Sequence, residues 1–349
     1  MKVLHVTEAL GGGVSTAILN YQALTPEMHH CVIARERVGQ STYNFPSELS
    51  VTLVPGSLAA LLLSAIRMVR RGDFDILHLH SSLAGLARII PGHRAGIVYT
   101  PHCYAFERTD VSPLARVLYK SVERGLLSIR RQCVVAVSGR EAELTTELSN
   151  SSTSIVVGNV SPTDHGAYLR ASSPRTAEAS AERSRVVMVG RIFPQKDPQL
   201  FADIAARLSS RFEFVWVGDG EAGLKESLVE SGVRVTGWIP AEQVLDEVRA
   251  SSLYLHTAAW EGAPISAAEA AAVGVSVISR DIKSMVSLGY PVAGNTAESL
   301  SMAVTHYFDC LDYRTTVQAK TQYFNRTVDV MSSRTALIDA YAFAIGASR

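Results

Sequence analysis

The chain has no excess of either charge. Its 349 residues include 33 Lys and Arg residues against 33 Asp and Glu residues, so the formal net charge is zero at pH 7. Proteins that bind the phosphate backbone of a nucleic acid usually carry a basic excess. The balance therefore argues against nucleic acid as the main partner, although it leaves room for a local basic patch.

Cysteine is also scarce. Cys31, Cys103, Cys133 and Cys310 are scattered and form no CxxC pair, which is neither a zinc spacing nor the disulfide framework of a small domain. Cys31 and Cys133 open apolar runs, where a free thiol behaves as a small hydrophobic group, so both are expected in buried strands. The pattern suits a reducing cytoplasm.

Long apolar segments are missing as well. The longest runs from residue 58 to residue 66, is interrupted by Ser64 and stops at Arg67, whereas a membrane-spanning helix needs about 20 residues. Residues 1–6 read as a strand and not as a secretory signal. We therefore expect a cytoplasmic protein that is at most peripheral on the inner face of the cytoplasmic membrane.

The sequence does contain a regular alternation of short apolar runs and helical patterns, which indicates βαβ units and parallel sheets. Strands are expected at residues 3–6, 31–34, 51–54, 76–80, 97–100, 133–137 and 155–157, and again at 185–189, 212–217, 233–236, 253–257 and 275–279. Helices are expected at residues 198–208, 222–231, 241–250, 264–273 and 297–308, and a last one over 325–349.

The texture changes between the two series of strands. Residues 161–184 are polar, rich in Ser, Ala and Pro, and lack a hydrophobic period, as a linker or loop does. We predict an α/β protein with two Rossmann-like α/β/α domains, residues 1–160 and 185–324, facing each other across a cleft. The helix over 325–349 is expected to pack back toward the N-terminal domain.

Three glycines, residues 11–13, follow the first expected strand and precede a helix. Glycine lets the backbone approach a ligand, and a helix N-terminus favours an anion. Gly12 and Gly13 are therefore candidate ligand contacts, although a plain tight turn explains them equally well. His102 follows the expected strand 97–100 and faces the expected cleft, but a loop histidine without a role is the commoner case.

Two cations lie just beyond the first strand of the second series. Arg191 follows residues 185–189, and Lys196 precedes a helix that Asp197 caps and Pro198 begins. Open α/β sheets bind ligands outside the carboxyl ends of their strands. Arginine contacts phosphate bidentately and lysine acts as a point charge, so the pair could hold a diphosphate. Two solvated loop charges are the alternative.

Two glycine turns follow the next strands along the chain. Gly218 ends the expected strand 212–217, and Trp238 follows Gly237 after the expected strand 233–236. Both turns should lie at the same sheet edge, where either could pack against a base. Each, taken singly, is more often an ordinary turn between a strand and a helix.

The most specific segment is WEGAPISAAEA, residues 260–270. Glu261 precedes a helix that Pro264 is expected to begin, and Glu269 lies about one and a half turns inside it. The candidate contacts between them are Gly262, Ala263, Pro264, Ile265 and Ser266. The free amides of residues 265–267 would form a phosphate or sugar site, flanked by two carboxylates that accept hydrogen bonds from hydroxyls.

A structural role for both glutamates is the alternative, with one in a loop and one buried. The alanine-rich surroundings of Glu269 argue against it, because an unpartnered carboxylate there would cost free energy.

Together, the spacing from Glu261 to Glu269, the upstream Arg191 and Lys196, the glycine-rich first turn and His102 resemble glycosyltransferase family 4, the retaining GT-B enzymes. The resemblance covers nearly the whole chain in the family's order. Its most specific element is the pair of glutamates separated by seven residues.

The resemblance implies a role for each matching residue. Glu269 would hold the ribose hydroxyls of a nucleotide, and Glu261 with the backbone after it would contact the donor sugar. Arg191 and Lys196 would bind the diphosphate, assisted by Gly12 and Gly13 of an acceptor domain, while His102 would lie beside the reacting sugar. No metal cofactor is implied, because basic groups and a helix N-terminus neutralise the charge.

The implied activity is retaining transfer of a hexosyl or N-acetylhexosaminyl group from a nucleotide-sugar, expected to be a UDP-sugar, to a glycan or lipid-linked saccharide. The expected setting is bacterial O-antigen, capsule or exopolysaccharide biosynthesis. A GT-B-type nucleotide-sugar epimerase and a non-catalytic sugar-nucleotide-binding subunit are the alternatives. The first would need an acid/base pair of carboxylates in the first domain, and the sequence shows no convincing one.

Two segments depart from the family pattern. Many relatives carry Asn-Gly-Val/Ile-Asp where this chain reads Gly-Asn-Val-Ser at residues 158–161. The segment after Ser279 reads Arg-Asp-Ile-Lys and lacks the common Gly-Gly turn. Because the family usually places that loop near the donor, the sugar stays open.

A basic helix is the last candidate site. Arg116, Lys120, Arg124 and Arg131 are expected within a narrow arc of one helix, at about 100° per residue. With Arg67, Arg70 and Arg71 at the end of another helix they could contact anionic lipid. A solvated helix face is the alternative.

Overall fold

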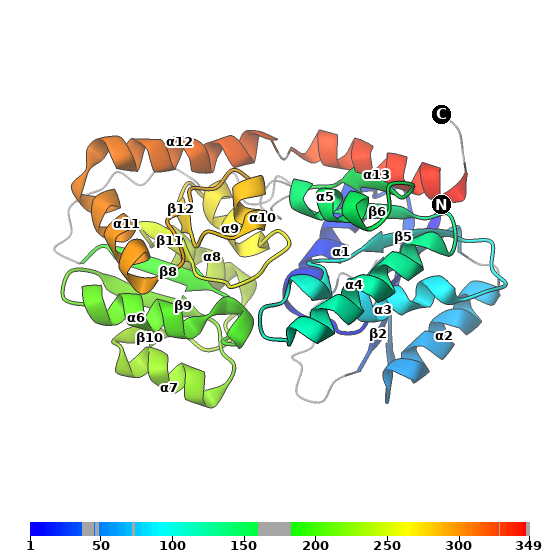
Figure 1. Ribbon diagram of the computed structural model, residues 1–349, viewed down its shortest axis with the longest axis horizontal. Helices are drawn as coiled ribbons and strands as arrows, with labels where there is room; N and C mark the ends of the chain where they lie inside the picture. Colours follow the sequence, from blue (N-terminus) through cyan, green and yellow to red (C-terminus); the bar gives the residue numbers. More distant parts are fainter. Residues whose placement is uncertain (37–44, 46–48, 72–73, 160–182, 328, 347–349) are drawn as a thin grey trace. The chain divides into compact units, whose positions relative to one another are not determined.

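Seven of the expected strands pair into one parallel sheet. The computed structural model describes residues 1–36, 45, 49–71, 74–159, 183–327 and 329–346 (Figure 1). The sheet has the order β3-β2-β1-β4-β5-β6-β7. Its strands are β1 Lys2–Thr7, β2 His29–Arg35, β3 Ser50–Val54, β4 Ile76–His80, β5 Gly96–Thr100, β6 Cys133–Ala136 and β7 Thr153–Val156.

Helices cover both faces of this sheet. They are α1 Gly12–Leu24, α2 Leu58–Arg70, α3 Ser81–Gly85, α4 Pro113–Ser128, α5 Gly139–Leu148 and α13 Val330–Ile345, with the short 3₁₀ segments η1 Leu86–Ile89 and η2 Ala105–Glu107. One face is apolar and packs against α2, α4 and α5. Because successive strand residues point to opposite faces, the other face carries His5 and His78, which contact tyrosines of α1 and α13.

The second sheet is smaller and has the order β10-β9-β8-β11-β12. Its strands are β8 Arg185–Val189, β9 Glu213–Val217, β10 Val233–Val235, β11 Leu253–His256 and β12 Ser276–Ser279. Its helices are α6 Pro198–Leu208, α7 Ala222–Glu230, α8 Ala241–Arg249, α9 Ile265–Ala272, α10 Lys283–Ser287, α11 Ala297–Asp309 and α12 Leu311–Thr327, and η5 spans Pro194–Lys196. Phe201, Phe214 and Trp216 are fully buried in its core.

Both sheets reverse their strand order beside their first strand. In the first sheet β1 lies between β2 and β4, and in the second β8 lies between β9 and β11. Chains that leave such a pair on opposite faces open a crevice at the carboxyl ends of the strands. The loops after β8 and β11 are therefore where the second sheet is expected to bind a ligand.

The chain divides into two compact units, Met1–Asn159 with Val330–Arg349, and Val160–Asp329. All expected strands overlap observed ones, and Cys31 and Cys133 are buried in β2 and β6. The expectation of one helix over residues 325–349 is wrong, since α12 ends at Thr327 and α13 begins at Val330. Helix α13 packs on β5, β6 and β7. Most of the expected linker, residues 161–182, lies outside the described residues.

Candidate functional site

Lys196 and Glu261 form an ion pair at the switch point of the second sheet. Lys196 ends η5 after β8, and Glu261 lies in the loop between β11 and α9. Their side chains keep only 17% and 11% of their exposure, so water screens the pair weakly. The two loops that flank the crevice thus present one cation and one anion, each held by the other.

Backbone hydrogen bonds tie these two loops together. The Ala259 N–H donates to the Gln195 carbonyl at 2.9 Å, and the Thr257 hydroxyl donates to the Lys196 carbonyl at 2.9 Å. The Gln195 side chain donates to the Trp260 carbonyl at 3.2 Å. These bonds fix where Lys196 lies relative to the segment that carries Glu261.

Two glycines make the close approach of the neighbouring loops possible. A Cβ on Gly190 would lie 2.9 Å from Cε of Lys196, whose stem crosses this glycine. A Cβ on Gly218 would lie 2.2 Å from the Gly190 carbonyl oxygen, and both glycines have positive φ angles that favour glycine. The missing side chain of the expected contact residue Gly218 therefore lets the turn after β9 pack against the loop after β8.

Arg191 and Trp238 occupy more exposed positions at the same strand ends. The Arg191 guanidinium stacks on the Phe193 ring, 4.3 Å from its centroid. Trp238 follows Gly237 after β10 and keeps 66% of its exposure. A large aromatic group so exposed is available for stacking on a planar ligand.

Helix α9 begins one residue later than expected. Pro264 is its N-cap and not its first residue, and no side chain caps the helix. The N–H of Ala267 donates to the Pro264 carbonyl at 3.2 Å, so the expectation of three outward amides is wrong for this one. The Ser266 hydroxyl forms a hydrogen bond with the Tyr254 hydroxyl at 2.8 Å. The donors that remain for a ligand at the start of α9 are the backbone amides of Ile265 and Ser266.

Glu269 lies one turn further along α9, after Ile265 and among buried alanines. Burial raises the pKa of its carboxyl to about 7, because removal from water penalises the charged form. Among the described residues its side chain has no hydrogen-bond or ion-pair partner. Gly262 of the same segment is buried, and Ala263 is partly exposed. When it is ionised, this unpartnered carboxylate is a strong hydrogen-bond acceptor, so a ligand with donor groups would stabilise it.

Arg280 follows β12, in the segment where the family resemblance led us to expect a Gly-Gly turn. Its guanidinium donates to Asp197 Oδ2 at 2.6 Å and to Asn295 Oδ1 at 3.1 Å. Asp197 in turn accepts a hydrogen bond from the Leu200 N–H at 3.1 Å, which confirms its expected capping of α6. A side chain thus braces the start of α6.

His102 stands in a strained turn of the first unit. His102 and Cys103 have φ angles of 51° and 81°, which side chains other than glycine rarely adopt. Glu141 braces the turn: its two carboxylate oxygens accept from the N–H groups of Cys103 and Val137 at 2.5 and 3.0 Å. Burial raises the Glu141 pKa to about 7. Gly12 and Gly13 begin α1, are exposed and have no side-chain cap beside them.

Two family models cover most of the chain. Residues 7–159 match the one described as "Glycosyl transferase 4-like domain", and residues 183–309 match the one described as "Glycosyl transferases group 1". The chain is a family 4 glycosyltransferase. The two matches fall on the two compact units, one on each parallel sheet.

Three of the curated relatives of this glycosyltransferase are bacterial proteins. It is 26% identical over 297 residues to a 41.2 kDa protein of the Klebsiella pneumoniae cps region, covering 82% of each chain. It is 25% identical to an Escherichia coli UDP-Gal:alpha-D-GlcNAc-diphosphoundecaprenol alpha-1,3-galactosyltransferase, covering 63% of this chain and 61% of that one. It is 26% identical to the Bacillus subtilis protein named "Putative teichuronic acid biosynthesis glycosyltransferase TuaC", covering 67% of this chain and 61% of that one.

Solved structures show that the glycosyltransferase has the GT-B fold. The lipopolysaccharide glycosyltransferase WaaG superposes with a TM-score of 0.73 at 16% identity, covering 99% of this chain and all of that one. Anabaena HepE, in complex with UDP and glucose, superposes with a TM-score of 0.73 at 16% identity and covers 97% and 98%. The predicted fold class is thereby confirmed.

The predicted basic arc of the glycosyltransferase is wrong in one member. Helix α4 ends at Ser128, so Arg131 lies outside it, and its guanidinium stacks on Phe343 of α13 at 4.3 Å. Arg116 is half-buried, and Lys120 is half-buried 3.8 Å from Glu147. The exposed face of α4 is instead apolar, with Arg124 beside it. No helix within the described ranges combines the length and apolar character needed to cross a bilayer.

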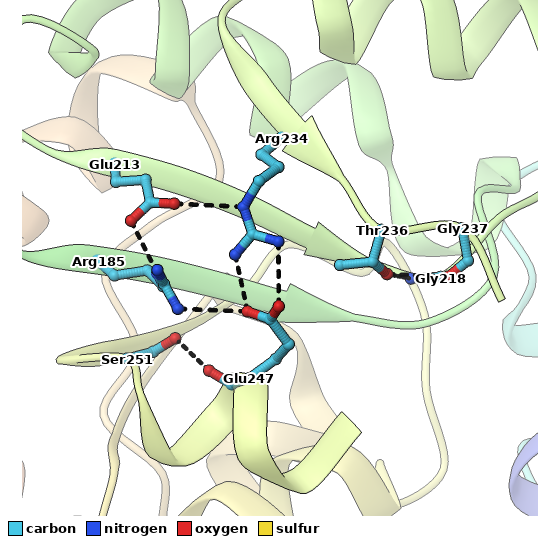
Figure 2. A network of polar contacts seen from close by, with 8 residues as sticks. All are labelled: Arg185, Glu213, Gly218, Arg234, Thr236, Gly237, Glu247 and Ser251. Atoms are coloured by element: carbon cyan, nitrogen blue, oxygen red, sulfur yellow. Dashed lines mark hydrogen bonds and ion pairs between the residues drawn. The ribbon is translucent and has the colours of Figure 1, made fainter. Parts of the chain in front are cut away.

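A second polar cluster lies at the opposite ends of the strands. Arg185 and Glu213 begin β8 and β9, and with Arg234 and Glu247 they form the network of Figure 2. Arg234 contacts both oxygens of Glu247, at 2.7 and 3.0 Å, and lowers the pKa of that carboxyl. These four charges neutralise one another at the amino ends of the strands, away from the carboxyl ends where Lys196 and Glu261 lie.

Sequence reasoning missed Glu141, Arg280 and the partners of His102. The capping pattern that begins at Ser138, with Glu141 at the third helical position, was a readable signal for Glu141. In the sequence, Arg280 stands out only as a departure from the family pattern. The histidines of the first sheet gave a signal too, since four of them interrupt apolar strands.

Proposed function

We propose that this glycosyltransferase moves a hexosyl or N-acetylhexosaminyl group from a UDP-sugar to a glycan or lipid-linked saccharide in bacterial surface polysaccharide biosynthesis, with retention at the anomeric carbon. The observation that carries the donor assignment is the Lys196–Glu261 ion pair together with the unpartnered carboxyl of Glu269 in the helix that follows Glu261. A nucleotide-sugar supplies hydroxyl donors for the unpartnered Glu269, and its diphosphate is an anion that Lys196 can bind beside Glu261.

We call the carboxyl ends of β8 and β11, with Arg191, Lys196, Glu261 and Glu269, the donor edge. Each of these residues has a role in this proposal. Lys196 and Arg191 bind the diphosphate and neutralise it as it leaves, assisted by the amides at the start of α9. Glu269 accepts hydrogen bonds from the ribose hydroxyls. Glu261 and the backbone that follows it contact the sugar, so the Lys196 contact orients the Glu261 carboxylate before the sugar arrives.

In the first unit, the residues that we propose contact the substrates are Gly12, Gly13 and His102. The strained turn at His102 supports a functional role, because such conformations persist only where the surroundings enforce them and they cluster at active sites. We propose front-face attack of the acceptor hydroxyl without a firmly placed protein nucleophile. The anomeric proton coupling of the product tests retention, and an inverted product would contradict this part.

A nucleotide-sugar screen tests the donor. We expect a UDP-sugar to raise the melting temperature more than GDP-, ADP- or dTDP-sugars, because a ligand that binds only the folded state stabilises it. The names of the Escherichia coli relative and of the HepE complex support UDP. A shift with none of the four classes would contradict the binding function, and a larger shift with another base would replace UDP.

Metal removal is expected to leave transfer unchanged. The proposal assigns the neutralisation of the leaving diphosphate to Lys196, Arg191 and a helix N-terminus, so no divalent cation is required. Initial rates before and after dialysis against EDTA, at equal ionic strength, measure this. A loss that added Mg²⁺ or Mn²⁺ restores would contradict the assignment.

We propose that α4 touches the membrane surface to reach a lipid-linked acceptor. Leu114, Val117 and Leu118 are 79%, 63% and 60% exposed on this helix, and the exposed Arg124 lies beside them, a combination typical of interfacial helices. Flotation with phosphatidylglycerol vesicles is expected to carry the protein upward, and Leu114→Ser/Leu118→Ser to abolish this without lowering the melting temperature. Absence of wild-type flotation would contradict the contact.

A further inference from the structure

Four histidines form one hydrogen-bonded chain through the first sheet. His30 Nδ1 lies 2.9 Å from His5 Nε2, and His5 Nδ1 lies 2.9 Å from His80 Nε2. His80 Nδ1 lies 3.0 Å from His102 Nε2. The chain crosses β2, β1 and β4 in their order within the sheet and ends on the strained turn after β5.

All four imidazoles are neutral around pH 7. Burial lowers the pKa of His30 and of His102 to about 4, and burial lowers the pKa values of His5 and His80 well below their ordinary value. A neutral imidazole has one N–H donor and one lone-pair acceptor. In each N···N contact, one of the two nitrogens must therefore carry the proton. Once that nitrogen is fixed in one contact, it is fixed in all the others.

Thr25, beside the His30 end of the chain, determines which nitrogens carry the protons. His30 Nε2 faces the Thr25 carbonyl at 3.3 Å and the Thr25 hydroxyl oxygen at 3.1 Å. The Thr25 carbonyl can only accept a hydrogen bond, and the Thr25 hydroxyl already donates its proton to the Tyr21 carbonyl at 2.8 Å. His30 must therefore carry its proton on Nε2 and accept at Nδ1.

The same direction propagates along the chain. His5 then donates from Nε2 and accepts at Nδ1, and His80 does the same in the next step. His102 must donate from Nε2 to His80. Its Nδ1 then carries a lone pair. The His102 ring is partly exposed, and no described residue forms a hydrogen bond with Nδ1.

We propose that the chain from Thr25 through His30, His5 and His80 locks His102 in the Nε2–H tautomer, so that its Nδ1 accepts a hydrogen bond from a substrate hydroxyl. The assignment rests on the proposed function, because it makes His102 part of the transfer site. It also restricts the substrate group at this position. A sugar hydroxyl can donate to Nδ1, whereas a phosphate or carboxylate oxygen would meet a lone pair and be repelled.

A metal ion is the alternative use of these side chains. His5, His78 and His80 bring one ring nitrogen each within 4.8 Å of one another. The His5–His80 separation of 2.9 Å, however, is shorter than the roughly 3.3 Å between ligands of tetrahedral zinc at about 2.05 Å. His78 already uses both nitrogens, one with the Tyr341 hydroxyl at 3.1 Å and one with the Thr100 hydroxyl at 2.9 Å. The distances fit shared protons.

Nitrogen NMR on the full-length protein with ¹⁵N-labelled histidine tests the proposal directly. The resonance that disappears in His102→Gln identifies His102. We expect its Nε2 to have the shift of a protonated ring nitrogen and its Nδ1 that of an unprotonated one, unchanged between pH 6 and pH 8. A protonated Nδ1, an averaged pair of shifts, or stoichiometric zinc in the purified protein would overturn the chain.

Two variants at His30 connect the tautomer to catalysis. His30→Leu removes the acceptor for His5, so we expect averaged His102 shifts. We expect a roughly tenfold lower kcat, by analogy with the loss of outer partners of metal-binding histidines, with an unchanged KM for the sugar nucleotide. His30→Asn places an oxygen acceptor near the position of the wild-type Nδ1, so it should restore both the His102 shifts and kcat. A normal kcat in His30→Leu with scrambled shifts would overturn the substrate contact.

The wild-type NMR result stands whether or not these variants fold. It also separates the two proposals. A locked Nε2–H tautomer in a protein that transfers no sugar would contradict the proposed function and leave the chain intact. Active transfer with a protonated Nδ1 would contradict the chain alone.

Discussion

Lys196→Met is expected to lower kcat by about 100- to 1000-fold, the usual cost of removing one preorganised charge from a developing anion. Methionine keeps an unbranched stem that can still cross Gly190. The change therefore removes the charge and little of the packing. Negative charge grows on the diphosphate in the transition state, so the loss should appear in kcat more than in the binding of UDP, measured by calorimetry.

The partner of Lys196 supplies the control. Lys196 pairs with Glu261, so its removal also leaves a poorly screened carboxylate beside the diphosphate. The double variant Lys196→Met/Glu261→Gln removes that carboxylate charge. If Lys196 serves only to neutralise Glu261, the double variant should turn over as fast as Glu261→Gln alone. If Lys196 binds the diphosphate, as we propose, the double variant stays slow.

Arg191→Ala tests the second cation. Arg191 is exposed and stacks on Phe193, so its loss should cost little stability. We expect kcat to fall further than in Glu269→Ala, because the guanidinium meets charge that grows during the reaction, whereas the ribose contact is formed already in the ground state. Unchanged turnover in Arg191→Ala would contradict the diphosphate scheme.

The strands could be read from the sequence because each is a short apolar run bounded by glycine or polar residues. Helix α12 could not, because it is polar and its described part buries only two side chains, Val317 and Thr321, to guide a periodicity argument. The end of α4 was missed for a related reason. Arg131 continues the helical pattern in sequence, and only the fold shows it stacked on Phe343 of α13.

The donor edge was predictable in composition but not in contacts. Lys196 and Glu261 each follow a strand, so local pattern placed them at one sheet edge, but their pairing depends on β8 and β11 being neighbours. The histidine chain depends on strand order in the same way, since His5 and His80 lie 75 residues apart. Local patterns fix which side chains reach an edge, and sheet order decides which of them meet.

The affinity for a UDP-sugar is expected to increase about tenfold from pH 6 to pH 8, following ionisation of a carboxyl with a pKa of about 7. Only the charged Glu269 accepts from both ribose hydroxyls. The diphosphate of a sugar nucleotide is a diester without an ionisation in this range, so the change reports the protein. Calorimetric titrations at constant ionic strength measure it.

The sign for stability is opposite in the free protein. Burial raises the folded pKa of Glu269 above its unfolded value, so the folded state holds the proton more tightly and loses stability as pH rises from about 4.3 to about 7. Glu269→Gln removes this slope. Its melting temperature should therefore depend less on pH than that of the wild type over this window.

Glu269→Gln should bind the UDP-sugar about 10- to 150-fold more weakly at pH 8, from roughly 1.5–3 kcal/mol for hydrogen bonds to a charged group. Its affinity should hardly change between pH 6 and pH 8. A 2′,3′-dideoxyribose analogue of the same nucleotide-sugar provides the matched ligand, since it should bind wild type and variant alike. If wild-type affinity for the natural donor is independent of pH, or if the analogue keeps the pH dependence, Glu269 does not hold the ribose.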